Sequence, residues 1–180
     1  MNIHQGLFSL SLFAVLVMAG TSAPRVRAAP NHSALDRIHV YAGSWKTEIE
    51  HYATPYSKAG KETGTLRNAC WASGDFYACR QIVNGKSGAL LVFTCTRNDG
   101  LCHSYVVPVN GDPAHNGKLL IKANVWIFPW QYHHDSKTTF FRVVNTWRSP
   151  NLIEYRQEYS PDDVHWTLMA RGQTIRQEKR

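Results

Sequence analysis

The stretch Gly43-Ser44-Trp45-Lys46-Thr47-Glu48-Ile49-Glu50-His51 decides the fold of this chain. From residue 45 onward, charged side chains alternate strictly with apolar or weakly polar ones. Successive side chains of a β-strand point to opposite faces, so the charged set faces water and the other set faces a core. The stretch therefore predicts a strand whose inner face carries Trp45, Thr47, Ile49 and His51.

Further short strands follow along the rest of the chain. We expect strands near 44–53, 62–72, 75–83, 87–96, 101–108, 117–122, 124–131, 137–147, 152–160 and 164–172. Turn signals such as Gly74-Asp75 and Asn84-Gly85 separate most of them. Connections this short make neighbours in sequence neighbours in the sheet, which favours an up-and-down antiparallel order. Closing about ten strands into a barrel removes exposed edges, and an open two-sheet sandwich is the alternative.

A short helix is expected before the first strand. Ser33-Ala34-Leu35-Asp36 resembles a capping box, and Gly43 is a suitable stop after the last helical turn. Helices shorter than about 12 residues are marginal alone, so this one needs an apolar surface to dock on. An open barrel end is the simplest such surface.

Gly43-Ser44-Trp45, the short helix before it, and Asp162-Asp163-Val164-His165-Trp166 with Arg171 after it together resemble the lipocalin and calycin barrels. The nearest resemblance is to an uncharacterised family of bacterial calycin-like proteins, over about residues 35–172. It implies that Trp45 plugs one barrel end and that Arg171 stacks on it. It implies no established reaction.

The N-terminus has the features of an export signal. Residues 7–20 form an apolar run that is shorter than the roughly 20 residues of a membrane-spanning helix. Val26-Arg27-Ala28 is a suitable cleavage site, so we expect a signal peptide over 1–28 and a single barrel domain over 29–180. An uncleaved anchor is the alternative. The mature chain is expected in the periplasm or outside the cell, with no transmembrane segment.

The charge pattern gives little sign of a nucleic-acid partner. The formal net charge is +7, and it falls to +5 without the two arginines of 1–28. Basic and acidic residues are interleaved, as on a solvated surface, and no nucleic-acid-binding motif is present.

The four cysteines of an exported chain predict two disulfides. A two-residue turn at Gly74-Asp75 places Cys70 directly opposite Cys79, and the segment 97–100 brings Cys95 and Cys102 together. The turn at Asn84-Gly85 would pair Cys79 with Leu90, on the opposite face from Cys95. We therefore expect Cys70–Cys79 and Cys95–Cys102.

Several polar side chains are candidates for ligand binding inside the barrel. Thr47 and His51 on the first strand and Tyr155 and Gln157 on the ninth are expected to point inward, where they could also simply bond one another. Arg67 and Arg142 share strand faces with apolar or small residues. If inward they would favour an anionic ligand, and the alternative is that both lie outside.

The remaining motifs carry no clear chemistry. The aromatic stretch 126–132 is a core segment or a ligand portal, and Pro129 predicts a bend or a sheet edge there. His133-His134-Asp135 is interpreted as a solvated loop, and no metal-ligand spacing is present. No nucleophile motif or acid–base pair is found, so the chain is not expected to be an enzyme.

The sequence therefore favours an exported, non-catalytic binder of a small, largely apolar molecule with one polar or anionic end. Haem binding through His51 is an alternative that would need a cofactor. An enzyme hidden in the cavity is another. A structural or interaction module with a filled barrel and an exposed Trp126 and Trp130 patch is the last.

Overall fold

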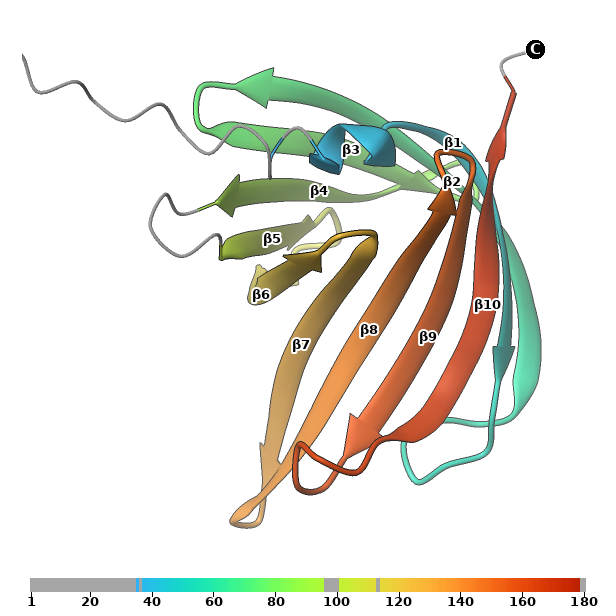
Figure 1. The fold of residues 1–180 in the computed structure, drawn as a ribbon, viewed down its shortest axis with the longest axis vertical. Coiled ribbons are helices and arrows are strands. Elements are labelled where there is room, and N and C mark those ends of the chain that lie inside the picture. Colours follow the sequence, from blue (N-terminus) through green and yellow to red (C-terminus); the bar gives the residue numbers. More distant parts are fainter. Residues whose placement is uncertain (1–34, 36, 96–100, 113, 179–180) are drawn as a thin grey trace, which may run out of the picture.

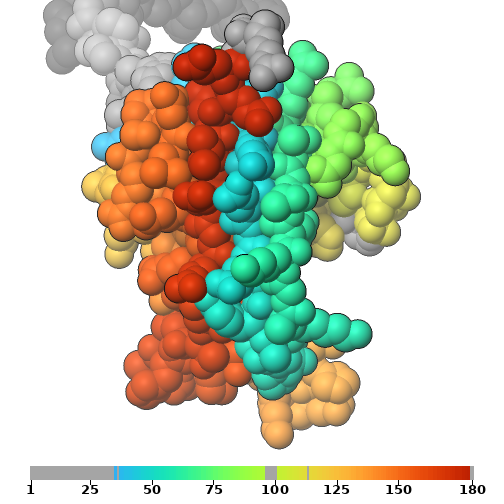
Figure 2. All heavy atoms as spheres, turned by 90° about the vertical axis from the view of Figure 1, so that its right-hand side faces the viewer, coloured from blue at the N-terminus to red at the C-terminus, as the bar shows by residue number. Residues whose placement is uncertain are grey.

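The computed structural model describes residues 35, 37–95, 101–112 and 114–178, and it contains a closed antiparallel barrel. Each strand pairs with its neighbours in sequence, and β1 and β10 pair to close the ring (Figure 1). In Figure 2, β1, in blue, lies between the last strand, in red, and β2, in teal. The up-and-down barrel is confirmed, and the open sandwich is wrong.

The elements have the following bounds: η1 His39–Tyr41, β1 Gly43–His51, β2 Gly60–Ser73, β3 Phe76–Val83, β4 Lys86–Cys95, β5 Cys102–Pro108, β6 His115–Lys122, β7 Val125–His134, β8 Lys137–Ser149, β9 Leu152–Ser160 and β10 Thr167–Gln177.

The N-terminal helix is shorter than expected. The helical element before β1 is a 3-10 turn at His39–Tyr41. Ser33, where the helix was expected to begin, and the signal peptide predicted over 1–28 both lie outside the described residues. Among the residues that are described, no helix has the length and apolar character needed to cross a membrane.

The last strand begins and ends later than predicted, at Thr167 and Gln177 rather than 164 and 172. Its start is delayed because the Asp162 carboxylate organises the preceding turn. Asp162 Oδ1 accepts hydrogen bonds from the backbone N–H groups of Val164 (3.0 Å) and His165 (2.8 Å). Residues held in this turn cannot join the ladder.

Both disulfides form as predicted, Cys70–Cys79 and Cys95–Cys102, and each joins directly opposed residues. The register between β3 and β4 differs from the expectation, because Cys79 lies opposite Leu91 and not Leu90. The ladder pairs Gln81 with Ala89 and Ile82 with Ser87, so one residue, Gly88, is extra on β4. The argument that placed Cys79 and Cys95 on opposite faces is therefore wrong, although the pairing it predicted is right.

The ladder between β6 and β7 is short. It covers Leu120–Lys122 and Val125–Ile127 only, while β7 continues to His134 along β8 alone. Pro129 has no N–H to donate. A Cβ placed on Gly117 would lie 3.8 Å from the Pro129 carbonyl oxygen, so the backbone edge of Pro129 faces β6. The edge predicted from Pro129 is thus confirmed.

Two aromatic clusters occupy the ends of the barrel. At the end covered by η1, the rings of Tyr41, Trp45, Trp126 and Trp147 pack against one another. At the other end of β8, Phe141 contacts Tyr56 and Trp130, and Tyr56 contacts Tyr159. Trp126 is therefore a core residue and not part of an exposed patch, whereas Trp130 is exposed.

Candidate ligand cavity

The barrel contains a partly open cavity of about 340 Å³, which Tyr41 of η1 helps to line. Its wall consists of alternate residues of β1 to β5 and of β7 to β10, as the period of two requires. The apolar part of the wall is formed by Trp45, Ile49, Leu66, Leu91, Phe93, Val106, Phe128, Val143 and Ile153. The polar part is formed by Thr47, Asn68, Gln81, Ser104, Asn145, Tyr155 and Thr174, with Tyr41 from η1. Every one of these side chains is uncharged in its ordinary state at pH 7.

Among the described residues, the fully buried side-chain atom without a partner is Trp147 Nε1, whereas the polar side chain that most closely concerns the cavity is Asn145. Its side chain is 7 % exposed and lines the cavity from β8, between the inward-facing Val143 and Trp147. Its amide makes no hydrogen bond to any residue that the structure describes. The amide borders the cavity space and is not among the fully buried atoms without a partner. The amide can therefore form a hydrogen bond with a bound molecule that offers it a donor or an acceptor.

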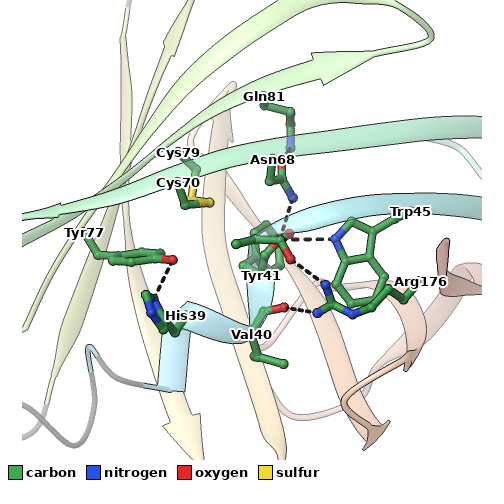
Figure 3. The surroundings of a disulfide bond; sticks show 11 residues. His39, Val40, Tyr41, Trp45, Asn68, Cys70, Tyr77, Cys79, Gln81 and Arg176 are labelled. Carbon is green, nitrogen blue, oxygen red and sulfur yellow. Dashed lines mark hydrogen bonds between the residues drawn. A yellow bond between two sulfur atoms is a disulfide. The ribbon is translucent and has the colours of Figure 1, made fainter. Parts of the chain in front are cut away.

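A chain of hydrogen bonds ties the cavity wall to η1 (Figure 3). Gln81 Nε2 donates to Asn68 Oδ1 at 3.4 Å, and Asn68 Nδ2 donates to the Tyr41 carbonyl oxygen at 3.1 Å. His39 Nδ1 lies 2.8 Å from the Tyr77 hydroxyl. These contacts hold η1 over the cavity.

Tyr155 and Gln157 both come from β9, as predicted, and they interact with each other. The Tyr155 hydroxyl donates to Gln157 Oε1 at 3.1 Å. Burial, followed by the nearby Glu62 carboxylate, raises the pKa of Tyr155 to about 12. The phenol therefore stays neutral at physiological pH. Tyr155 lines the cavity, while Gln157 supports it from beside the wall.

Thr47 lies in the cavity wall as predicted, but His51 does not. His51 follows the inner-face alternation to the end of β1, where its Nε2 lies 3.3 Å from Glu62 Oε2. No histidine is among the cavity-lining residues described, and no group of three potential metal ligands occurs in the described part of the chain. The haem hypothesis therefore lacks a histidine in the described wall of the cavity.

Both candidate arginines lie outside the barrel, so the expectation of an anion-binding arginine in the cavity is wrong for them. Arg67 is exposed because its neighbours Leu66 and Asn68 are the residues of β2 that face inward. Arg142 alternates in the same way with the inward Val143.

On the outer surface Arg142 has a structural role. Its Nε lies 2.6 Å from Glu158 Oε2, and its Cζ lies 3.8 Å from the centre of the Trp166 ring. It therefore fastens the β9–β10 connection to the barrel wall.

The arginine that stacks on Trp45 is Arg176, not Arg171 (Figure 3). Arg176 pairs directly with Trp45 across β10 and β1, and its Cζ lies 4.1 Å from the centre of the ring. Its Nη1 and Nη2 donate to the carbonyl oxygens of Ala42 (2.6 Å) and Val40 (2.7 Å). Arg171 is an odd number of residues away, so it faces outward and pairs with Glu50 at 3.1 Å.

The remaining sequence candidates are surface features. His133 Nδ1 lies 2.9 Å from Thr138 Oγ1 across the exposed β7–β8 hairpin. His134 Nε2 lies 3.1 Å from Asp135 Oδ2, with both side chains exposed. The motif is solvent-exposed as expected, but it is not a loop, because His133 and His134 are the last residues of β7 and only Asp135 lies in the turn.

The sequence prediction missed Asn145, Asn68 and Arg176. The candidates chosen on the same strands, Arg67, Arg142 and Arg171, lie an odd number of residues away, so counting in twos from them leads to the outer face. One available signal was that Asn145 lies two residues from the apolar Val143 on one side and from the apolar Trp147 on the other. Arg176 lies beyond residue 172, where the last strand was expected to end, so a longer predicted strand would have included it.

The closed meander of ten strands defines the chain as an all-β, up-and-down antiparallel barrel. Among solved structures, Rv2717c from M. tuberculosis aligns with a TM-score of 0.47 and 13% identity, over 81% of this chain and 98% of that chain. The S-type phycobiliprotein lyase CpeS from Guillardia theta aligns with a TM-score of 0.47 and 10% identity, over 81% and 93%. No family model and no curated protein matches the chain. Likenesses of this size carry no conclusion about function, and the expected membership of a bacterial calycin-like family stays a prediction.

Proposed function

We propose that this protein is an exported, non-catalytic binder of a small, uncharged and largely apolar molecule. The observation that carries the proposal is the cavity of about 340 Å³ with its neutral wall and the unpartnered amide of Asn145. Ligand pockets range from about 300 to 1,000 Å³, so this volume suits a small ligand.

The uncharged cavity wall disfavours a ligand with an anionic end, which the sequence had suggested. Moving an ionised group from water into an apolar site is strongly unfavourable unless it is paired there. No Lys, Arg or His among the described residues lines the cavity, so a carboxylate would have no counter-charge. An amide, ketone or hydroxyl fits Asn145 better, and the paired Thr174 and Thr47 add hydroxyls elsewhere in the cavity wall.

The disulfide-bonded state of the cysteines supports the proposal of export. Both disulfides form, and the described residues contain no free cysteine. Disulfides persist mainly in oxidising compartments such as the periplasm or the extracellular space.

The test is a titration with N-phenyl-1-naphthylamine, a neutral apolar probe whose fluorescence rises on leaving water. We expect saturable binding to the wild type. Ser104→Trp, which places a large ring in the cavity, is expected to lower the affinity at least tenfold. Tyr105→Trp is the matched control, because the next residue of β5 faces outward and is exposed. Absence of saturable binding, or equal loss in both variants, would refute the cavity proposal and favour a structural module.

A further inference from the structure

The outer face of β2 to β6 carries a set of exposed apolar and basic side chains. The cross-strand register places Trp71, Ala78, Val92 and Tyr105 in one row. The next row on one side contains Phe76, Thr94, His103 and Lys118, and the next on the other contains Arg80, Leu90 and Val107. We define the aromatic–basic face by the residues that protrude most: Trp71, Phe76, Arg80, Tyr105, Val107 and Lys118.

The aromatic side chains of this face are substantially exposed. Phe76 is 51 %, Trp71 48 % and Tyr105 38 % exposed. Adjacent strands lie about 4.8 Å apart, so five strands give a surface about 20 Å wide. Contiguous exposed apolar surface with a polar margin is typical of an interaction site.

The same half of the barrel carries the net charge of the mature chain. Residues 76–149 contain eight Lys or Arg and three Asp or Glu, a balance of 8 − 3 = +5. Residues 29–75 and 150–180 together contain ten of each, a balance of zero. The three acids of 76–149 are Asp99, which lies outside the described residues, and Asp112 and Asp135, neither of which lies in a strand.

Two cations of the face are free to attract an external anion. Neither Arg80 nor Lys118 forms an ion pair with a described residue, and Arg80 only donates to Ser87 Oγ at 3.2 Å. By contrast Arg142 and Arg148, elsewhere on this half, are paired with Glu158 and Glu154. Asp75, in the β2–β3 turn, is the acid that adjoins the face.

We propose that the aromatic–basic face docks the barrel on an anionic lipid bilayer. Tryptophan and tyrosine favour the membrane–water interface, where the ring is buried and its polar edge stays wet. Lysine and arginine are attracted to anionic headgroups at the same depth. Trp71 and Phe76 stand on the two strands of one hairpin and enter the interface, while Arg80 and Lys118 contact headgroups beside them. The two disulfides favour an oxidising compartment such as the periplasm or the extracellular space. Lipid surfaces are the common anionic partner there, which favours a bilayer over a nucleic acid. The proposal does not require an occupied cavity.

The test is co-sedimentation with vesicles of phosphatidylcholine and phosphatidylglycerol in a 70:30 ratio, using the chain purified from its producing cells. We expect binding that weakens as salt rises. Each surface cation contributes roughly fivefold to partitioning, so Arg80→Glu with Lys118→Glu is expected to lower it at least tenfold. Trp71→Ser with Phe76→Ser is expected to do the same.

The matched control is Val164→Ser with Lys58→Glu, which removes an exposed apolar residue and a cation away from the face. It is expected to bind within twofold of the wild type. All variants keep the same N-terminus, so lipid binding by that segment cannot produce the difference. If the wild type fails to sediment with the vesicles, or the control loses as much as the other variants, the proposal is wrong.

Two further measurements distinguish lipid docking from nucleic-acid binding and from binding in the cavity. Tighter binding to a poly-dT oligonucleotide than to vesicles, lost in the same variants, would overturn the lipid assignment in favour of nucleic acid. Binding of N-phenyl-1-naphthylamine in all variants is expected to match the wild type, because the changes lie outside the cavity. A failure of docking is thereby distinguished from a failure of the cavity proposal.

Discussion

Arg176 joins three segments at the covered end of the barrel. It stacks on Trp45 and donates to Val40, Ala42 and, through Nε, to the Pro150 carbonyl at 3.1 Å. We expect Arg176→Ala to lower the free energy of unfolding by about 2–4 kcal/mol, through lost charge-assisted hydrogen bonds and the lost ring contact. Arg171→Ala is the control, and it is expected to change little because exposed ion pairs contribute little. Denaturant unfolding of both variants checks this, and equal losses would contradict it.

Asp162 is the residue at which stability should depend on acid pH. Hydrogen bonds from the His165 side chain, two backbone N–H groups and Ser160 Oγ hold the pKa of this carboxyl well below its usual range. A carboxyl whose folded pKa is depressed stabilises the fold above its unfolded pKa, near 4, and loses that effect as pH falls through the folded value. We expect the Tm advantage over Asp162→Asn to be constant from pH 7 to 5 and to shrink at pH 3. A constant difference down to pH 3 would show that the carboxylate charge is irrelevant.

At the scale of elements, the disulfides staple two hairpins, β2–β3 and β4–β5. Each closes a short loop, and the chain-entropy model gives about 2–3 kcal/mol for loops of this length. We expect Cys70→Ala with Cys79→Ala to lower the free energy of unfolding by that amount without opening the barrel. The register survives because the same residues stay directly opposed through backbone hydrogen bonds. Chemical denaturation with and without reductant measures the effect, and a wild type insensitive to reductant would contradict it.

The sequence was most informative where period-two alternation is clean. Trp45 and Thr47 were placed inward correctly, and the turn at Gly74-Asp75 was sufficient for Cys70–Cys79. Alternation fails where one residue is inserted, and the extra Gly88 moved the β3–β4 register by one.

The sequence left it ambiguous, for another reason, whether Arg67 and Arg142 face the inside or the outside of the barrel. The outer face of this barrel is itself partly apolar, so an apolar neighbour does not identify the inside. Arg142 even shields Glu158, whose side chain is 9 % exposed although it lies on the outer face. Only the three-dimensional register decides such positions.

At the scale of the whole molecule, acidic and basic residues are unevenly distributed between the two halves of the barrel. The acidic strands β1, β2 and β9 carry Glu–Arg and Glu–Lys pairs such as Glu50–Arg171 and Lys46–Glu48. The strands β3 to β8, whose residues are all described, contain no acid. If the basic half rests on a bilayer, the β6–β7 edge beyond Ile127 lies on that same half. An apolar ligand of the cavity would then be held beside the phase in which it dissolves best.

Closure of the whole barrel depends on Gly172, where β10 meets β1. Gly172 pairs with Ile49 on one side and Tyr155 on the other, and a Cβ there would overlap the carbonyl oxygen of Glu48. Because that neighbour is backbone, it cannot move without separating the two strands that close the ring. We expect Gly172→Ala to lower the free energy of unfolding by about 3 kcal/mol or more, at the upper end of single substitutions.

The matched control is Gly60→Ala, where a Cβ meets nothing within 4 Å. It is expected to be neutral or slightly stabilising, because alanine restricts the unfolded chain more than glycine does. Hydrogen exchange locates the effect: faster exchange in Gly172→Ala should be concentrated in β1 and β10, since opening at this junction converts a closed ring into a sheet with two free edges. Uniformly faster exchange over all strands would show instead that the barrel unfolds as one unit and that no closing junction exists.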